Sequence, residues 1–183
     1  MDWDALLADL ESRFEAERRA DIAAQAADLA EAEVAAVRMT DRLRGAVGRT
    51  IRLRTHGGTP VDGVLARAED GFMLIDEGDG LQALVPTGSL AFIAPLPGPA
   101  PEPDGRRRPT LQAAARELAR TGARVRAVTA AGDVIGRIAR VGADYLDVVV
   151  DGSRGGEQRL AGGAPRGGVI TVALGALDVL RSR

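Results

Sequence analysis

The hydrophobic positions near the N-terminus follow a helical spacing. Trp3, Leu7, Leu10 and Phe14 are separated by four, three and four residues, which places them on one face of an α-helix. Residues 2–44 contain no Gly or Pro and are rich in Ala, Glu and Arg, a composition that favours a continuous helix. The pattern therefore predicts one long N-terminal helix, roughly 60 Å in length at ~1.5 Å per residue.

The apolar stripe on this helix is thin, and it continues only weakly through Ile22, Ala26, Leu29, Ala36 and Val37. A long helix with such a stripe needs a partner, so we expect it to pair with another chain in a coiled coil or bundle. The alternative is a helix that breaks near residues 18–21 and folds back on the rest of the protein.

Two later stretches, residues 47–93 and 123–181, show β-forming side chains punctuated by Gly and Asp, which predicts short strands. The stretches are copies of one another. The matched pairs are Gly48 with Gly122, Thr55 with Thr129, Gly63 with Gly136, Leu65 with Ile138, Phe72 with Tyr145, Val85 with Val172, Gly88 with Gly175, and Leu90 with Leu177. Gly63 and Gly136 fall inside strand patterns, where Gly permits the sharp bend that curls a short sheet closed.

A proline-rich segment separates the two copies. Six of the nine prolines lie in residues 95–109, and alternating Pro favours an extended, semi-rigid linker. After it, Thr110 is a suitable N-cap for an Ala-rich helix that ends near Gly122, where Gly can adopt the left-handed conformation.

We therefore expect an α+β protein with a long N-terminal helix and two five-stranded small β-barrels, each preceded by a helix. The expected domains are the helix (1–44), the first barrel (45–94), the linker (95–109), and a helix with the second barrel (110–183).

Composition narrows the chemistry. The chain has no Cys and one His, and its 24 basic side chains are all Arg. These counts exclude disulfides, thiolate catalysis, cysteine zinc sites and Schiff-base lysines. We expect no enzyme activity, no cofactor and no metal, with a carboxylate-metal enzyme as a distant alternative. No apolar run reaches the ~18 residues of a membrane span and no signal segment opens the chain, so we expect a cytoplasmic protein.

The net charge of −2 is unevenly distributed. Residues 1–104 hold 10 Arg and 19 acids, a net charge of −9, and residues 105–183 hold 14 Arg and 7 acids, a net charge of +7. Such asymmetry fits an anionic partner for the basic part, attraction between halves of neighbouring chains, or simply two solvated faces.

The repeat resembles the Sm-like fold, most closely the Hfq family of bacterial RNA chaperones. The resemblance rests on the helix before each copy, the turn Gly, the strand Gly, the Asp70-Gly71-Phe72 and Ala143-Asp144-Tyr145 steps, and the closing strands within 85–93 and 172–180. It implies single-stranded RNA binding, a post-transcriptional or RNA-chaperone role, and a homo-oligomer in which three chains form a six-unit ring. Small barrels of the Src-homology and PRC types share much of the pattern.

The family's Lys-His pair is missing, since Thr87-Gly88 and Leu174-Gly175 stand at those positions. The remaining candidates for RNA contact are alternating arginines, which strand periodicity places on one face, and the two aromatics of the Asp-x-aromatic steps. The predicted nucleic-acid-binding residues are Arg52, Arg54, Phe72, Arg124, Arg126, Arg137, Arg140 and Tyr145. The alternatives are a solvent-exposed face for the arginines and core positions for the aromatics.

Other features are less specific. Arg106-Arg107-Arg108 and the Arg-Gly-Gly triplets at 154–156 and 166–168 could add phosphate contacts, or be a linker and a loop tip. His56 lies in a turn signal and is expected to be exposed. The second functional hypothesis is a protein-interaction scaffold that docks partners through its small barrels and self-associates through the N-terminal helix.

Overall fold

The computed structural model describes residues 3–101, 108–151 and 168–182. The chain divides into two compact units, residues 1–38 and 39–183, which we call the helical unit and the sheet unit. None of the helices in the described ranges is both long and apolar enough to cross a membrane.

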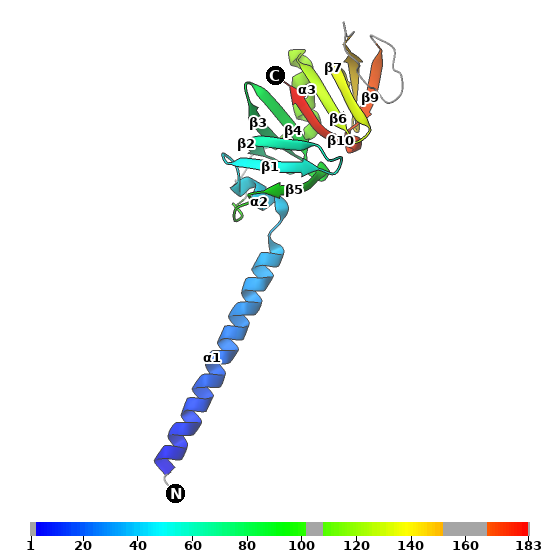
Figure 1. The fold of residues 1–183 in the computed structure, drawn as a ribbon. Coiled ribbons are helices and arrows are strands. Elements are labelled where there is room, and N and C mark those ends of the chain that lie inside the picture. The colour runs from blue at the N-terminus through cyan, green and yellow to red at the C-terminus, as the bar shows by residue number, and fades with distance from the viewer. Residues whose placement is uncertain (1–2, 102–107, 152–167, 183) are drawn as a thin grey trace. The chain divides into compact units, whose positions relative to one another are not determined.

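The helical unit contains a single helix. Helix α1 (Trp3–Ala36) runs for 34 residues without interruption (Figure 1), so the alternative of a break near residues 18–21 is wrong. An ion pair one turn apart, Asp9 with Arg13 at 2.7 Å, supports it locally. The next helix, α2 (Met39–Gly45), is separate from α1 and belongs to the sheet unit, so the prediction that one helix extends to residue 44 is wrong at its C-terminal end.

The sheet unit is built around ten antiparallel strands and a third helix, α3 (Leu111–Thr121). The first five strands are β1 (Thr50–Thr55), β2 (Pro60–Ala68), β3 (Phe72–Gly78), β4 (Leu81–Pro86) and β5 (Leu90–Ala94). The second five are β6 (Arg124–Thr129), β7 (Gly132–Val141), β8 (Tyr145–Val150), β9 (Val169–Ala173) and β10 (Leu177–Ser182). Short 3-10 turns, η1 (Thr87–Ser89) and η2 (Leu174–Ala176), precede β5 and β10.

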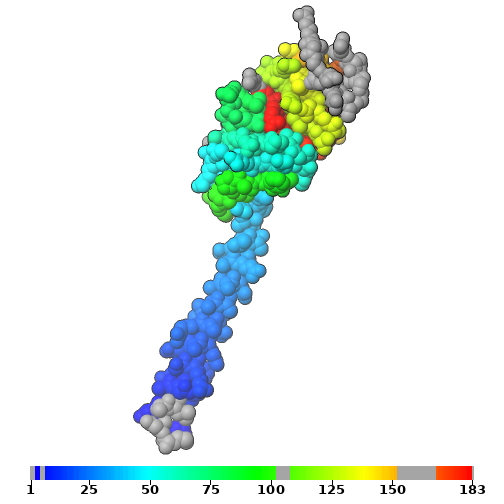
Figure 2. All heavy atoms as spheres, viewed as in Figure 1, coloured from blue at the N-terminus to red at the C-terminus, as the bar shows by residue number. Residues whose placement is uncertain are grey.

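The expectation of two separate five-stranded barrels, each preceded by a helix, is wrong. All ten strands form one sheet in the order β5-β1-β2-β3-β4-β10-β6-β7-β8-β9. The two halves join where β4 pairs with β10, in a register that sets Leu84 opposite Leu180 and Ala83 opposite Arg181. Within its own half, β4 has a partner strand on only one side, and so does β10. Pairing β4 with β10 provides hydrogen-bond partners for the backbone groups at both edges, so neither half closes into a barrel by itself. Figure 2 shows β10, in red, between the first half in green and the second half in yellow.

Two hydrophobic cores lie on the sheet. One is built mainly from β1–β4 and α2, and includes Leu43, Ile51 and Ile75. The other is built mainly from β6–β10 and α3, and also takes in Phe72 and Leu84 from the first half. Both faces of the central strands β4 and β10 are therefore buried. Strands that are buried on both faces typically have continuous runs of apolar residues.

The internal repeat is visible in the structure. Within each half the strand order is the same, with the fifth strand beside the first. The pairing shifts at the same place in both copies, between Leu65 and Arg67 on β2 and between Ile138 and Arg140 on β7. At Gly63 a Cβ atom would lie 2.2 Å from the carbonyl oxygen of Asp76, and at Gly136 it would lie 1.9 Å from that of Val149. Both glycines therefore permit a close backbone approach that a larger residue would prevent.

The structure confirms the predicted ends of α3 at Thr110 and Gly122. The Thr110 side chain accepts a hydrogen bond from the backbone N–H of Ala113, and Gly122 closes the helix in the left-handed region with φ of 67°. Helix α3 packs against the core formed by the second half, through Ala115 above all.

Part of the proline-rich segment lies against α2. The Arg42 guanidinium donates hydrogen bonds to the carbonyl oxygens of Leu96 and Pro97, at 2.7 and 3.2 Å, and the N–H of Ala100 donates to that of Asp41. Residues 102–107, including Arg106 and Arg107, lie outside the described part of the chain.

Candidate interaction surfaces

Most of the arginines predicted to contact RNA are paired with aspartates. Five of the six form an ion pair with an Asp of the sheet unit, and two of them, Arg124 and Arg137, share Asp151, the residue after β8. The pairs are Arg52 with Asp62 at 3.5 Å, Arg124 with Asp151 at 2.6 Å, Arg126 with Asp133 at 2.6 Å, Arg137 with Asp151 at 3.6 Å, and Arg140 with Asp147 at 4.0 Å. Exposed pairs of this kind add little to stability, but each Asp lowers the positive potential around the Arg side chains that it contacts.

Arg54 is the exception. Its side chain is exposed and makes no ion pair with any residue that the structure describes. The acids of these pairs, one on each of β2, β7 and β8 and one directly after β8, are visible in the sequence, but only strand register shows which Arg each of them contacts. For example, β1–β2 pairing places Arg52 directly opposite Asp62, a favourable cross-strand pair.

The two aromatics lie in different environments. Phe72 is 4% exposed and belongs to the core that contains Leu84 and Ala115, so its ring face is not presented to solvent. Tyr145 is half-buried against Gly142, where an added Cβ would lie 2.2 Å from the tyrosine ring. Neither position is the open stacking platform that a single-stranded base requires.

Two weaker candidates have clear outcomes. His56 is an exposed turn residue, as predicted, and its backbone N–H donates to the carbonyl oxygen of Ser89. The Arg-Gly-Gly triplets at 154–156 and 166–168 lie outside the described residues, except for Gly168.

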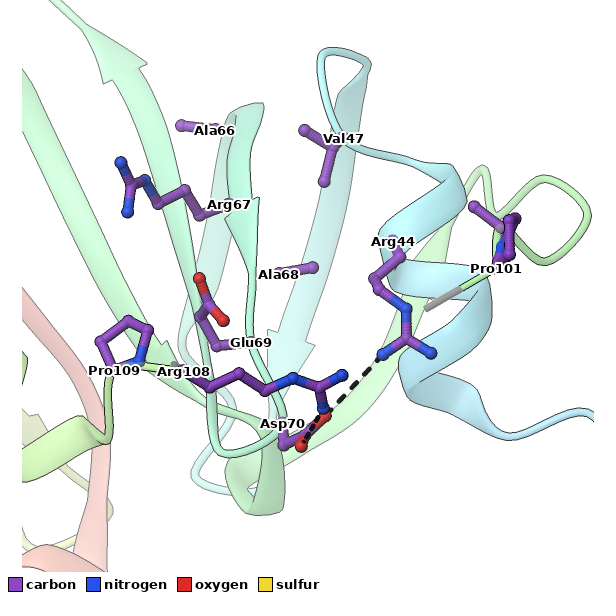
Figure 3. A pocket seen from close by; sticks show the side chains of 11 residues that line it. Arg44, Val47, Ala66, Arg67, Ala68, Glu69, Asp70, Pro101, Arg108 and Pro109 are labelled. Atoms are coloured by element: carbon purple, nitrogen blue, oxygen red, sulfur yellow. Dashed lines mark hydrogen bonds and ion pairs between the residues drawn. The ribbon is translucent and has the colours of Figure 1, made fainter. Parts of the chain in front are cut away.

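A pocket of about 500 Å³ lies beside α2 and the turn between β2 and β3. Arg44 and Arg108, which line the pocket, both contact the carboxylate of Asp70 (Figure 3). Arg44 also forms an ion pair with Asp41. These ion pairs tie α2 to the β2–β3 turn, while the Nε of Arg44 is buried without a hydrogen-bond partner among the described residues. Across the described ranges, no group of three His, Cys, Asp or Glu side chains is placed to hold a metal ion.

The most unusual surface is that of α1. Every side chain described in this helix is exposed, including Trp3 at 63% and Phe14 at 67%. Leu7 and Leu10 lie between these aromatics on the same face, so four large apolar side chains form one stripe. We call Trp3, Leu7, Leu10 and Phe14 the α1 stripe.

The edges of the sheet are a second unusual surface. Strands β5 and β9 are the outermost strands, and no other strand of the described ranges pairs with their outer sides. Neither strand contains a charged residue, although 27% of the chain is charged. Natural proteins usually protect such edges with charges, Pro or a covering segment.

Comparison with known proteins assigns no family. No protein-family model matches the chain, and no curated protein matches its sequence. The resemblance to Sm-like proteins therefore stays a prediction, and the functional argument rests on the surfaces described above.

Proposed function

We propose that this protein is an assembly scaffold that acts through protein–protein contacts, with the α1 stripe as its self-association surface. The observation that carries the proposal is the exposure of four large apolar side chains along one face of a 34-residue helix. The proposal assigns a binding role to the chain and no reaction.

The physical basis is the cost of leaving the stripe in water. Burying one Leu or Phe side chain is worth about 1.5–3 kcal/mol, and helix pairing buries such residues from both partners at once. The 4-3-4 spacing is the a/d spacing of a coiled coil, which continues for only two heptads before Glu17 and Asp21 interrupt it. This short seam fits a limited contact at the N-terminal end of α1, between copies of the chain.

The ion-paired arginines favour this role over RNA binding. Release of counterions from phosphates drives nucleic-acid binding, and it requires cationic side chains whose charge is not already neutralised. RNA binding stays a prediction with Arg54 as its clearest remaining contact.

The single tryptophan gives a direct test, because Trp3 belongs to the stripe. In the 183-residue chain, association buries the indole, so its fluorescence emission shifts to shorter wavelength as concentration rises. The variant Leu7→Glu/Phe14→Glu should abolish this shift and lower the mass measured by light scattering.

The matched control is Ser12→Glu/Ala16→Glu, which adds the same charge to the opposite face of α1. This control should behave like the unmodified protein. The proposal is wrong if both variants leave the emission and the mass unchanged, or if both change them equally. Fluorescence anisotropy with single-stranded RNA at several salt concentrations separates the alternatives: salt-sensitive binding supports RNA recognition, and no binding supports the scaffold.

A further inference from the structure

We propose that a second pocket, between α3 and the sheet at the junction of the two halves, binds a small carboxylic acid with an apolar chain. The pocket has a volume of about 350 Å³, which lies within the range of small-molecule sites in proteins. It shares no residue with the α1 stripe, so this proposal and the scaffold proposal succeed or fail separately.

The sheet side of the pocket is a row of leucines that crosses the junction. Strand pairing sets Leu74 on β3 opposite Leu84 on β4, and Leu84 opposite Leu180 on β10. All three side chains line the pocket. This side therefore comes from both halves of the repeat, and it exists only because the halves form one sheet.

Helix α3 forms the opposite side. Ala114, Leu118 and Thr121 line the pocket, and their spacing of four and three residues places them on one face of the helix. The ring of Phe72 adds a further apolar surface from β3. A hydrocarbon chain between these two sides would be removed from water, which is the main source of affinity for an apolar ligand.

A cation without a partner lies at one end of the leucine row. Arg67 on β2 is paired in register with Leu74 and lines the same pocket. Its guanidinium forms no ion pair or hydrogen bond with any residue that the structure describes. Figure 3 shows this side chain directed away from Asp70 and Arg108, so the acid of the first pocket does not pair with it.

The other charged residue of the lining is already paired. Glu117 on α3 accepts a hydrogen bond from the guanidinium of Arg120, which leaves Arg67 as the charge available to a ligand. A carboxylate matches a guanidinium through two parallel hydrogen bonds. The apolar lining favours this singly charged group over a phosphate, because burial of additional charge is costly.

The sheet also indicates the length of the ligand. The row from Arg67 to Leu180 crosses four neighbouring strands, a distance of about 14 Å at the usual strand spacing. An extended chain of medium length, with its carboxylate at the Arg67 end, fits along this row.

Isothermal titration calorimetry of the 183-residue chain with octanoate tests the proposal. Two probes of the same chain length, 1-octanol and octylammonium, report the contribution of the charged group. Octanoate should bind at one site per chain and about tenfold more tightly than 1-octanol, because only the carboxylate accepts charge-assisted hydrogen bonds from Arg67. Octylammonium should bind most weakly, since its charge is repelled by the guanidinium.

The variant Arg67→Gln should weaken octanoate binding by about tenfold and leave 1-octanol binding unchanged, and Arg67→Lys should retain part of the preference for octanoate. The matched control is Arg116→Gln, which removes the same charge from an exposed position of α3 outside the pocket. This control should bind octanoate like the unmodified protein. Circular dichroism checks that each variant keeps the fold.

A second pair of variants tests the apolar part of the pocket. Ala114→Phe places a ring inside the pocket and should abolish octanoate binding. Ala113→Phe, at the exposed neighbouring position on the same helix, makes the same change in size outside the pocket and should leave binding unchanged.

The proposal is overturned if octanoate does not bind, if 1-octanol binds equally tightly, or if Arg116→Gln weakens binding as much as Arg67→Gln does. Tighter binding of an acetylated tripeptide that ends in leucine would also overturn it, in favour of the C-terminus of a protein partner. Loss of octanoate binding with an intact Trp3 emission shift rejects the pocket and leaves the helix proposal standing.

Discussion

Strands β4 and β9 occupy the same place in the two repeats, and they differ in what covers them. On β4, Leu84 is 4% exposed because β10 and the second core lie against it. Its counterpart on β9, Thr171, is exposed and hydrogen-bonds the carboxylate of Asp147 at 2.7 Å. Two strands at equivalent positions of the repeat thus become an inner strand and an edge strand. Within the described residues, β4 pairs with a strand on each side, whereas β9 pairs only with β8.

The largest expected effect comes from removing the buried side chain of this pair. Leu84→Ala should lower the free energy of unfolding by about 2–5 kcal/mol, since it leaves a cavity among packed side chains. Thr171→Ala should change it by less than about 1 kcal/mol, the value of one exposed hydrogen bond. Urea denaturation monitored by circular dichroism measures both, and equal losses would contradict the asymmetry of the two strands.

A smaller loss of stability is expected at Gly63 and Gly136, the equivalent glycines of the two repeats. Gly63→Ala and Gly136→Ala each force a Cβ against a backbone carbonyl oxygen, at 2.2 and 1.9 Å in the present geometry. Overpacking of this kind costs about 1–3 kcal/mol, and the two variants should agree within about 1 kcal/mol. Gly88→Ala, where a Cβ meets nothing within 4 Å, is the control in the same denaturation experiment. A strongly unequal response would show that the bends in the two halves are not equivalent.

The smallest effect concerns the ion pair that joins the halves. Arg181 on β10 donates two hydrogen bonds to the carboxylate of Glu77 on β3, at 2.7 and 3.0 Å, and a third to the carbonyl oxygen of Pro60. Its loss in Arg181→Ala should cost about 1–2 kcal/mol, because hydrogen bonds to charged groups that are partly shielded from water are among the stronger ones.

The comparison for this pair is Arg52, whose ion pair with Asp62 is largely exposed. Arg52→Ala should fall within about 0.5 kcal/mol of the unmodified protein. A double-mutant cycle with Glu77→Gln isolates the pair energy of Arg181, and a coupling energy near zero would show that the junction does not depend on this contact.

For the predicted site residues, the sequence indicated which side chains are exposed but not which residues lie beside them. Periodicity correctly placed Arg52, Arg124 and Arg126 on exposed positions of their strands, but it carried no information on the strand that would lie beside them. The aspartates that pair with them come from β2, β7 and the residue after β8, and strand register decides those contacts. Phe72 shows the same limit, because its burial depends on α3 and β10, which are distant in the sequence.

The sequence by itself determined features that arise from short-range interactions: a long N-terminal helix, though not its end at Ala36, the caps of α3 at Thr110 and Gly122, the exposed turn at His56, and the glycines at matching positions of the two repeats. Only the tertiary structure decided that β4 joins β10 into one sheet and that Arg and Asp neutralise each other across strands. The physical reason is that capping, helix propensity and backbone bending act within a few residues. An unpaired strand edge, by contrast, can bond to any compatible edge, and the fold brings Leu84 and Leu180 together across almost one hundred residues.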